Sequence, residues 1–281
     1  MDANSTRDEY LPQSTEAVVR ACLHIATVLG AVLDELTVVG GLVPSLLAPP
    51  GDLPEGMPPH VGTLDLDLGM SLAVLDEALY TTVAAQLRKA GFGPDANERG
   101  NPTVQRWRSP QDLPRVTVDF LIPVSGQAIR PDRVMKLDRD LGAVVTPGLQ
   151  LVGRDRRKVL LAGTTLAGAE ARRSVWVCGP AAYTVLKARA IHGRAKNKDA
   201  YDLCYVLGWS AQRLGEVAAQ LRGMLDDDDA TEALAWLAED FARTACLGPE
   251  RYAAFLGQPQ SVAMRQDAAA LVRQLLRLVE A

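Results

Sequence analysis

The chain has 281 residues, of which 48% are hydrophobic, and a formal net charge of −4 at pH 7. Its length allows one large domain or two modest ones, and its apolar content is sufficient for a sizeable core. The four cysteines lie far apart without a Cys-x-x-Cys pair, beside only three histidines, which argues against a disulfide framework or a zinc site and fits a reducing compartment.

The N-terminal region predicts a protein of the cytoplasm. Residues 1–13 are polar and charged and lack the apolar segment of a signal peptide. The apolar run over 17–36 is interrupted by charged residues, so it predicts an amphipathic helix, capped by Ser14 or Thr15, in place of a membrane span.

A glycine pair follows the first predicted strand. Residues 36–39 read as a short buried strand, Gly40 and Gly41 end it, and a short helix or turn over 42–48 comes next. Glycines at such a turn let backbone N–H groups approach a phosphate closely, although most glycine pairs mark ordinary turns. The proline- and glycine-rich loop over 49–59 is either a lid beside a site or a surface linker.

The segment 60–69 carries the most informative pattern in the chain. Leucines alternate there with Asp65 and Asp67, which is the period of a strand with one apolar and one acidic face. Aspartate is depleted in strands, so two on one face need an explanation. Paired carboxylates suit two divalent cations in phosphoryl chemistry, and the alternative is an edge strand with a solvated face.

A second strand adds a third acid. Residues 103–108 and 115–124 predict a pair of strands joined by a polar turn, and the second of them contains Asp119. Arg106 and Arg108 alternate on the first strand, where a solvated face is favoured over a phosphate contact. Two or three short strands are expected over 150–178. Helices are predicted over 72–90, 180–192, from residue 198 onward, 211–225, 230–245, 249–256 and 261–280.

Positive charge is concentrated in one part of the chain. Residues 1–129 carry 8 basic and 16 acidic side chains, residues 130–200 carry 15 and 6, and residues 201–281 carry 7 and 12. The middle stretch would attract nucleotide phosphates or an RNA backbone. The alternative is a surface that neutralises the protein's own acidic segments.

Lysines cluster near residue 190. The chain has 24 arginines and 6 lysines, and Lys187, Lys196 and Lys198 lie within twelve residues. The ammonium of lysine is a compact point charge, and its use in a chain that otherwise prefers arginine suggests a triphosphate ligand. Asp199 and Asp202 share a helix face, and an ordinary salt-bridged helix is the alternative interpretation.

Taken together, these segments resemble a known family. Residues 39–42, 63–68 and Asp119 are similar to the core of the DNA polymerase β-like nucleotidyltransferases. Residues 186–189 and 196–203 resemble the lysine and Lys-Asp-x-x-Asp-Leu motifs of the AbiEii-type toxins of type IV toxin–antitoxin systems, which include the MenT-like toxins. The resemblance extends over residues 36–207.

The resemblance implies a fold and a reaction. The fold would be an α/β nucleotidyltransferase domain with a mixed sheet over 14–178, followed by a helical domain over 179–281. The reaction would move a nucleoside monophosphate from an NTP to a hydroxyl group, with two Mg²⁺ ions bound to the protein. The implied site residues are Asp65, Asp67 and Asp119 for the metal ions, Gly40, Gly41 and Thr63 for the nucleotide, Lys187 for the leaving pyrophosphate, and Asp202 for orienting Lys187 or a polar group of the nucleotide.

The resemblance also implies an acceptor, the 3′ end of tRNA, whose extension would stop growth unless a cognate antitoxin protein intervenes. One departure is Val61, which stands where relatives often have an arginine. A phosphoryl group on Thr63 would add nearly two negative charges beside Asp65 and displace nucleotide or metal. Four alternatives remain open: nucleotidylation of a protein, nucleotidylation of a small molecule such as an antibiotic, a metal-dependent phosphohydrolase, and a non-catalytic nucleotide-binding partner.

Overall fold

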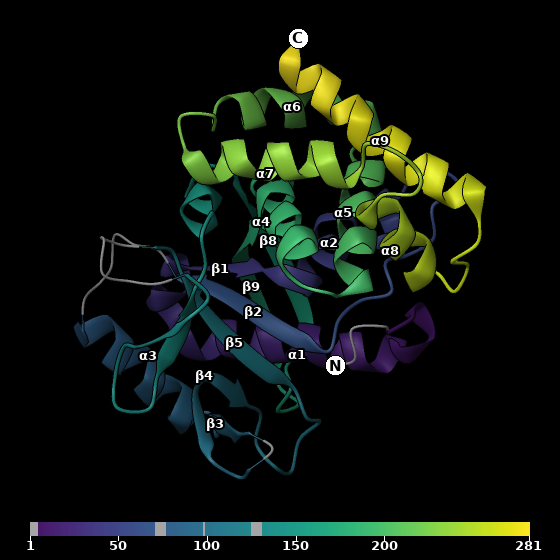
Figure 1. The fold of residues 1–281 in the computed structure, drawn as a ribbon. Coiled ribbons are helices and arrows are strands. Elements are labelled where there is room, and N and C mark those ends of the chain that lie inside the picture. The colour runs from purple at the N-terminus through teal and green to yellow at the C-terminus, as the bar shows by residue number, and fades with distance from the viewer. Residues whose placement is uncertain (1–4, 71–76, 98, 125–130) are drawn as a thin grey trace. The chain divides into compact units, whose positions relative to one another are not determined.

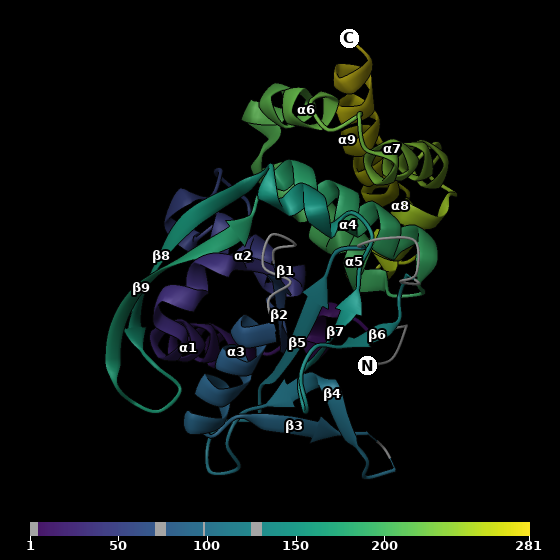
Figure 2. The ribbon, with the colours of Figure 1, turned by 90° about the vertical axis from the view of Figure 1, so that its left-hand side faces the viewer.

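Figures 1 and 2 show a computed structural model of the chain, which describes residues 5–70, 77–97, 99–124 and 131–281. The chain divides into two compact units. The α/β unit comprises Pro12–Leu46 and Gly62–Cys178, and the helical unit comprises Met1–Leu11, Leu47–Val61 and Gly179–Ala281. The sequence expectation placed a boundary after residue 178, and residue 178 is one of the points at which the chain passes between the units.

The described part of the α/β unit contains one mixed sheet of nine strands. Seven strands follow the order β3-β4-β5-β2-β1-β9-β8, and β7 pairs with both β5 and β6. Three pairs are parallel, namely β1 with β9, β2 with β5, and β5 with β7, and the others are antiparallel. The strands are β1 (Leu36–Val39), β2 (Asp65–Met70), β3 (Gly93–Ala96), β4 (Pro102–Arg108), β5 (Thr117–Ile122), β6 (Val134–Lys136), β7 (Gly142–Val145), β8 (Arg156–Thr164) and β9 (Glu170–Cys178).

Alternation along the central strands separates an apolar face from a polar one. Leu66, Val118 and Phe120 are fully buried, whereas the acids that alternate with them are partly exposed. Helix α1 (Pro12–Leu29) packs on β8 and β9 and against α3 (Glu77–Lys89). Figure 2 shows α1 and α3 together beside the sheet. Burial of apolar side chains between helix and sheet therefore fixes the orientation of β2 and β5.

Helix α1 begins earlier than its sequence suggested. It starts at Pro12, a residue that suits the first turn of a helix, so the expected cap at Ser14 or Thr15 is wrong. Pro12–Glu35 is long and apolar enough to cross a membrane by length and composition alone. In the structure Val18 and Ile25 of this helix are buried, which is the pattern of a core helix of an α/β unit.

The described part of the helical unit contains six α-helices, the N-terminal residues 5–11 and the segment Leu47–Val61. Tyr205 donates a hydrogen bond to the carbonyl of Pro58 at 3.0 Å, and the backbone N–H of Val61 donates to the Tyr201 hydroxyl at 3.3 Å. The proline-rich loop is thus held by side chains of the helical unit. The helices are α4 (Pro180–Gly193), α5 (Asn197–Trp209), α6 (Leu214–Arg222), α7 (Asp228–Asp240), α8 (Leu247–Phe255) and α9 (Val262–Glu280).

The expected order, a mixed α/β sheet followed by helices, is confirmed. The expectation of two or three short strands over 150–178 is wrong in length, because β8 and β9 each have nine residues. Strands β3, β6 and β7 were not predicted, since they are short and β3 contains glycine and proline. The helix expected over 72–90 is described from Glu77, and its first residues lie outside the described part of the chain. The helix α2 (Val43–Leu47) matches the turn expected after the glycine pair.

Candidate active site

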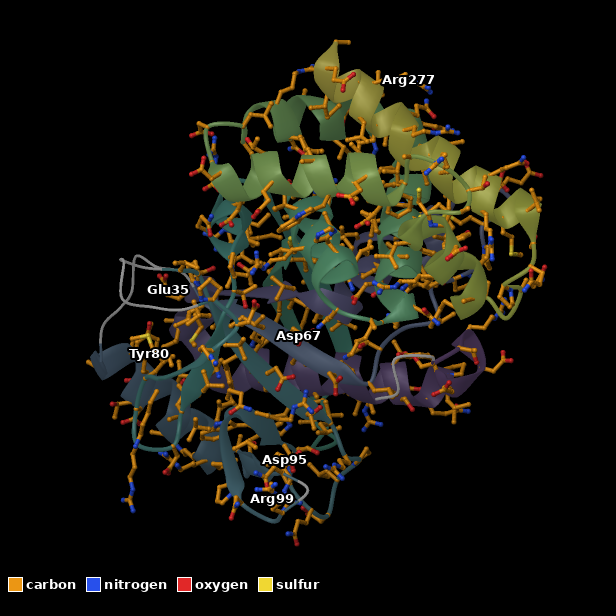
Figure 3. The ribbon with its side chains drawn as sticks, in the orientation of Figure 1. Glu35, Asp67, Tyr80, Asp95, Arg99 and Arg277 are labelled. Carbon is orange, nitrogen blue, oxygen red and sulfur yellow. The ribbon has the colours of Figure 1, made fainter. Side chains whose placement is uncertain are left out.

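Three carboxylates lie on one face of two neighbouring strands of the α/β unit. β2 and β5 run parallel, with Asp67 opposite Asp119 and Asp65 opposite Thr117. Residues opposite each other in a ladder project to the same face, and so do residues two apart in a strand. Asp65, Asp67 and Asp119 therefore share a face, and we call them the acidic cluster. Figure 1 shows β2 and β5 side by side, and Figure 3 labels Asp67 on β2.

Hydrogen bonds fix the chain just before the acidic strand. The backbone N–H of Thr63 donates to the Thr15 hydroxyl at 3.2 Å, and the Thr63 hydroxyl accepts from the backbone N–H of Asp65 at 3.4 Å. The same hydroxyl donates to the carbonyl of Asp65 at 3.2 Å. Gly62 has a φ of +84°, and a Cβ there would overlap the Thr15 side chain. Thr63 is only 6% exposed, so its hydroxyl serves the start of β2, and a modifying enzyme would first have to expose it.

Gly40 lies directly against Asp67. β1 and β2 pair antiparallel with Val39 opposite Asp67, so the turn that follows β1 begins beside the carboxylate. Gly40 has a φ of +67°, and a Cβ on it would lie 1.8 Å from Oδ2 of Asp67. This position therefore requires glycine for two separate reasons, its backbone conformation and the absence of a side chain. Gly40 and Gly41 form the first two residues of a 3₁₀ turn, as the sequence suggested for the glycine pair.

Arg106 of β4 occupies the acidic cluster as a cation. It lies opposite Asp119 in the antiparallel β4–β5 ladder. Its Nε donates to Oδ1 of Asp119 at 2.8 Å and its Nη2 to Oδ2 at 2.6 Å, which is the two-point geometry of an arginine–carboxylate pair. The hydrogen bond to Asp119 raises the pKa of Arg106 above its ordinary value, and the charges of Asp65 and Asp67 raise it further. The Arg106 side chain is still 43% exposed, so the expected solvated face is found, and the ion pair with Asp119 is what the sequence did not predict.

Asp65 also has a close polar neighbour. The Thr117 hydroxyl, on the same face of β5, donates a short hydrogen bond to Oδ1 of Asp65. Thr117 is 9% exposed, so this contact orients the Asp65 carboxylate from within the sheet. Sequence reasoning missed Thr117, although its position two residues before Asp119 on an alternating strand places it on the acidic face.

The donor chemistry of the acidic cluster suits a hard divalent cation, because Mg²⁺ prefers carboxylate oxygens. No group of three or more His, Cys, Asp or Glu side chains within the described residues is arranged to hold a metal ion. Both oxygens of Asp119 bond the Arg106 guanidinium in this structure. Asp65, Asp67 and Asp119 therefore fit magnesium by donor type and common face, provided that Arg106 gives up its place.

The helical unit contains a second group of charges, of which all but Arg194 are almost completely buried. Lys187 Nζ lies 2.7 Å from Oδ1 of Asp199 and 2.7 Å from Oδ2 of Asp202. Lys198 donates to Asp202 at 2.6 Å, and Arg194 binds Asp199 through two hydrogen bonds of 2.8 and 2.9 Å. We call these five side chains the buried network. The contact expected between Asp202 and Lys187 is present, and the side chain of Lys187 is only 7% exposed.

Charge pairing decides the ionisation of this network. Burial alone would lower the pKa of Lys187, but Asp199 and Asp202 outweigh it, so the net shift is upward. Burial would raise the pKa of Asp202, but Lys187 and Lys198 outweigh it and hold that pKa well below its ordinary range. The aspartates and Lys187 therefore stay charged across the physiological range, which is the condition under which buried ions stabilise one another.

His60 joins this network from the segment Leu47–Val61. Its Nε2 lies 2.9 Å from Oδ1 of Asp202, and its ring stacks on Tyr201 with 5.2 Å between ring centroids. Burial, together with the charge of Lys198, lowers the pKa of His60 to about 4, so the imidazole is neutral at pH 7 and donates to the carboxylate. Sequence reasoning missed His60, because its partner Asp202 lies 142 positions away.

The structure thus brings Asp65, Asp67 and Asp119 together with Gly40 in the α/β unit, and Lys187 together with Asp202 in the helical unit. Comparison with known proteins adds nothing to this description. No protein-family model matches the chain, and no curated protein matches it significantly.

Proposed function

We propose that the chain is a metal-dependent nucleotidyltransferase that moves a nucleoside monophosphate from an NTP to a hydroxyl acceptor. The observation that carries the proposal is the register of β2 and β5. It aligns Asp67 with Asp119 and sets Asp65 on the same face, beside a glycine turn that presents backbone to the carboxylates. Oxygen donors grouped on rigid strands are the arrangement that phosphoryl-transfer enzymes need.

The three carboxylates and the glycine turn each have a part in the proposed reaction. Asp65, Asp67 and Asp119 would hold two Mg²⁺ ions, which supply charge to the triphosphate and stabilise the attacking and leaving oxygens. After Arg106 has left Asp119, this carboxylate would accept the proton of the acceptor hydroxyl while the hydroxyl oxygen bonds to the α-phosphorus. The bond from the α-phosphorus to the bridging oxygen then breaks, and pyrophosphate leaves with the electron pair. Backbone N–H groups near Gly40 and Gly41 would bind phosphate oxygens.

Further elements of the proposal rest on the family resemblance alone. These are tRNA as the acceptor, a role as a growth-inhibiting toxin with a cognate antitoxin, and a cytoplasmic location. The action of Lys187 on the leaving pyrophosphate is likewise a prediction. Its bonds to Asp199 and Asp202 would hold its ammonium charged and in one orientation.

The test is incubation of the protein with labelled ATP, CTP, GTP or UTP, one at a time, together with Mg²⁺ and total tRNA, followed by a denaturing gel. We expect label on RNA, lost in Asp67→Asn. The matched control is Asp140→Asn, because Asp140 pairs with Arg88 elsewhere in the same unit. Label on protein, or on an added aminoglycoside, would change the acceptor class. Release of nucleoside monophosphate without any labelled acceptor would contradict the proposal and indicate a phosphohydrolase. Equal labelling by Asp67→Asn would also contradict it.

A further inference from the structure

The hairpin of β8 and β9 presents an exposed face of mixed basic and aromatic character. The two strands pair without interruption from Arg156 opposite Cys178 to Thr164 opposite Glu170. Figure 2 shows them as a long curved ribbon beside α1. Leu161 and Val175 are buried on the face toward the helix. The opposite face, which we call the basic face, carries Arg156, Lys158, Leu160, Arg172, Ser174 and Trp176. Near the hairpin turn the same face also carries the acid Glu170, which accepts a hydrogen bond from the Thr164 hydroxyl at 2.6 Å.

The cations of the basic face are poorly neutralised. Arg172 is exposed and forms no ion pair with a carboxylate in the described residues. Lys158 lies 3.4 Å from Asp34, but both side chains are more than half exposed, so water and salt screen this pair strongly. Arg156 lies over the Trp176 ring, 4.2 Å from its centroid, and Lys158 lies over the same ring at 4.8 Å. Trp176 therefore holds two cations of the basic face, the half-buried Arg156 and the exposed Lys158, beside one another.

The hairpin is anchored, which makes this face a fixed surface. Three hydrogen bonds join its turn to α1. The N–H of Leu166 donates to the carbonyl of Arg20 at 3.1 Å, and the guanidinium of Arg20 donates to the carbonyl of Thr165 at 3.2 Å. The N–H of Ala167 donates to Nδ1 of His24 at 3.2 Å. A preorganised surface loses little conformational entropy when it binds a partner.

We infer that the basic face is a docking surface for the phosphate backbone of RNA. The inference rests on the proposed function, in which the acceptor is an RNA hydroxyl, and it names the surface that would hold that acceptor. Polyanion backbones bind rows of arginine and lysine by releasing counterions. A lipid surface fits less well, because Leu160, 49% exposed, is the most exposed large apolar side chain of the face, and membrane-binding surfaces insert several such side chains.

Edge protection is the competing explanation. β8 is the last strand of the sheet, and charged side chains on edge strands prevent pairing with other chains. That role predicts self-association when the charges are removed and no effect on RNA. The two explanations are therefore separable by experiment.

Neighbouring arginines supply a matched pair of variants. Arg172 and Arg173 are both exposed, but they belong to opposite faces, and Arg173 Nη1 folds back to the carbonyl of Arg172 at 2.8 Å. The measurement is fluorescence anisotropy of labelled total tRNA against the full chain, in EDTA without nucleotide, at several KCl concentrations. Loss of one phosphate contact lowers the slope of log affinity against log salt by about 0.7 to 0.9. We expect this loss for Arg172→Gln and no change for Arg173→Gln or for Arg277→Gln on α9.

Replacement of Asp34 provides a test in which the affinity for tRNA should increase, a result that misfolding would not produce. It pairs with Lys158 and accepts a hydrogen bond from the Trp176 indole at 3.2 Å. Asp34→Asn keeps an oxygen that can accept the indole proton but removes the negative charge from the cations. We expect Asp34→Asn to bind tRNA more tightly, with a steeper salt slope than the unaltered protein.

Equal slopes for Arg172→Gln, Arg173→Gln and Arg277→Gln would overturn the inference, because binding would then follow total charge. Unchanged RNA binding together with self-association of Arg172→Gln, seen by size-exclusion chromatography, would overturn it in favour of edge protection. Loss of binding to phosphatidylserine vesicles by Arg172→Gln, without loss of tRNA binding, would overturn it in favour of a membrane. The assay involves no metal or nucleotide, so its result is independent of whether the acidic cluster transfers nucleotides.

Discussion

Replacement of Arg106 by glutamine should tighten the binding of divalent ions at the acidic cluster. The guanidinium is bonded to both oxygens of Asp119 and is a resident cation that an incoming ion has to displace or lie beside. Arg106→Gln removes the positive charge and keeps a polar side chain of moderate length. Arg106→Lys keeps the charge and serves as the matched variant.

The size of the effect follows from Coulomb's law. A guanidinium about 5 Å from a dication, in a medium with the dielectric constant of water, opposes it by about 1.7 kcal/mol. The Arg106 side chain is 43% exposed, so the water value is the appropriate lower limit. An energy of this size corresponds to roughly 15-fold in affinity. Breaking the ion pair with Asp119 would add to it, so the gain in affinity should be about tenfold or more.

Calorimetric titration with Mn²⁺ or Mg²⁺ at constant ionic strength, without nucleotide, measures this gain. Arg115→Gln is the control, because Arg115 pairs with Asp95 at 3.2 Å in another arginine–aspartate pair of the same unit. We expect tighter binding in Arg106→Gln and unaltered affinity in Arg106→Lys and Arg115→Gln. Affinity in Arg106→Gln equal to or weaker than that of the unaltered protein would refute the view that Arg106 competes with metal ions.

Three more predictions concern single positions. Gly40→Ala would place a Cβ 1.8 Å from the Asp67 carboxylate, so we expect calorimetric titration to show loss of divalent-ion binding. Gly30→Ala is the control, because Gly30 has a φ of +56° but open space around it, and we expect this variant to lose only about 1 to 2 kcal/mol in the free energy of unfolding. Lys187→Met would leave buried carboxylates without their main partner, and we expect a loss of about 3 to 5 kcal/mol in urea unfolding; a loss below 1 kcal/mol would contradict it. Burial lowers the pKa of His60 to about 4 from 6.5, so the unfolded chain binds the additional proton between these values. The contribution of His60 to the free energy of unfolding should therefore be fully present above pH 6.5 and fall by about 3 kcal/mol as the pH drops towards 4. Urea unfolding at several pH values measures this dependence, and His60→Gln should lose most of it.

Local patterns in the sequence predicted the faces of strands but not their partners. Alternation of leucine with Asp65 and Asp67 was sufficient to place both acids on one side of β2, because the side-chain period of a strand is fixed. The pairing of β2 with β5 is a contact between residues about fifty positions apart. Only the register of that ladder sets Asp67 opposite Asp119, and a shift of one residue would have moved Asp119 to the buried face.

The same reasoning explains what was missed. Arg106 reaches Asp119 because the turn between β4 and β5 has a length that aligns them, and its sequence predicts a turn without specifying the register. His60 reaches Asp202 because the chain leaves the α/β unit at residue 47 and returns at 62. A local residue pattern does not predict this passage of the loop into the helical unit, because the path depends on which surface the loop packs against.

That passage has a consequence for dissection of the protein. The polypeptide passes from one unit to the other after residues 11, 46, 61 and 178, so no single cut in the backbone liberates either of them whole. A fragment of residues 179–281 would lack His60 and Tyr10, whose rings lie beside Tyr201 and Phe255, and Asp202 would lose one of its hydrogen-bond donors. The helices that begin at residue 180 are therefore synthesised long after the two N-terminal segments on which they pack, so the helical unit can be completed only when the whole chain is present.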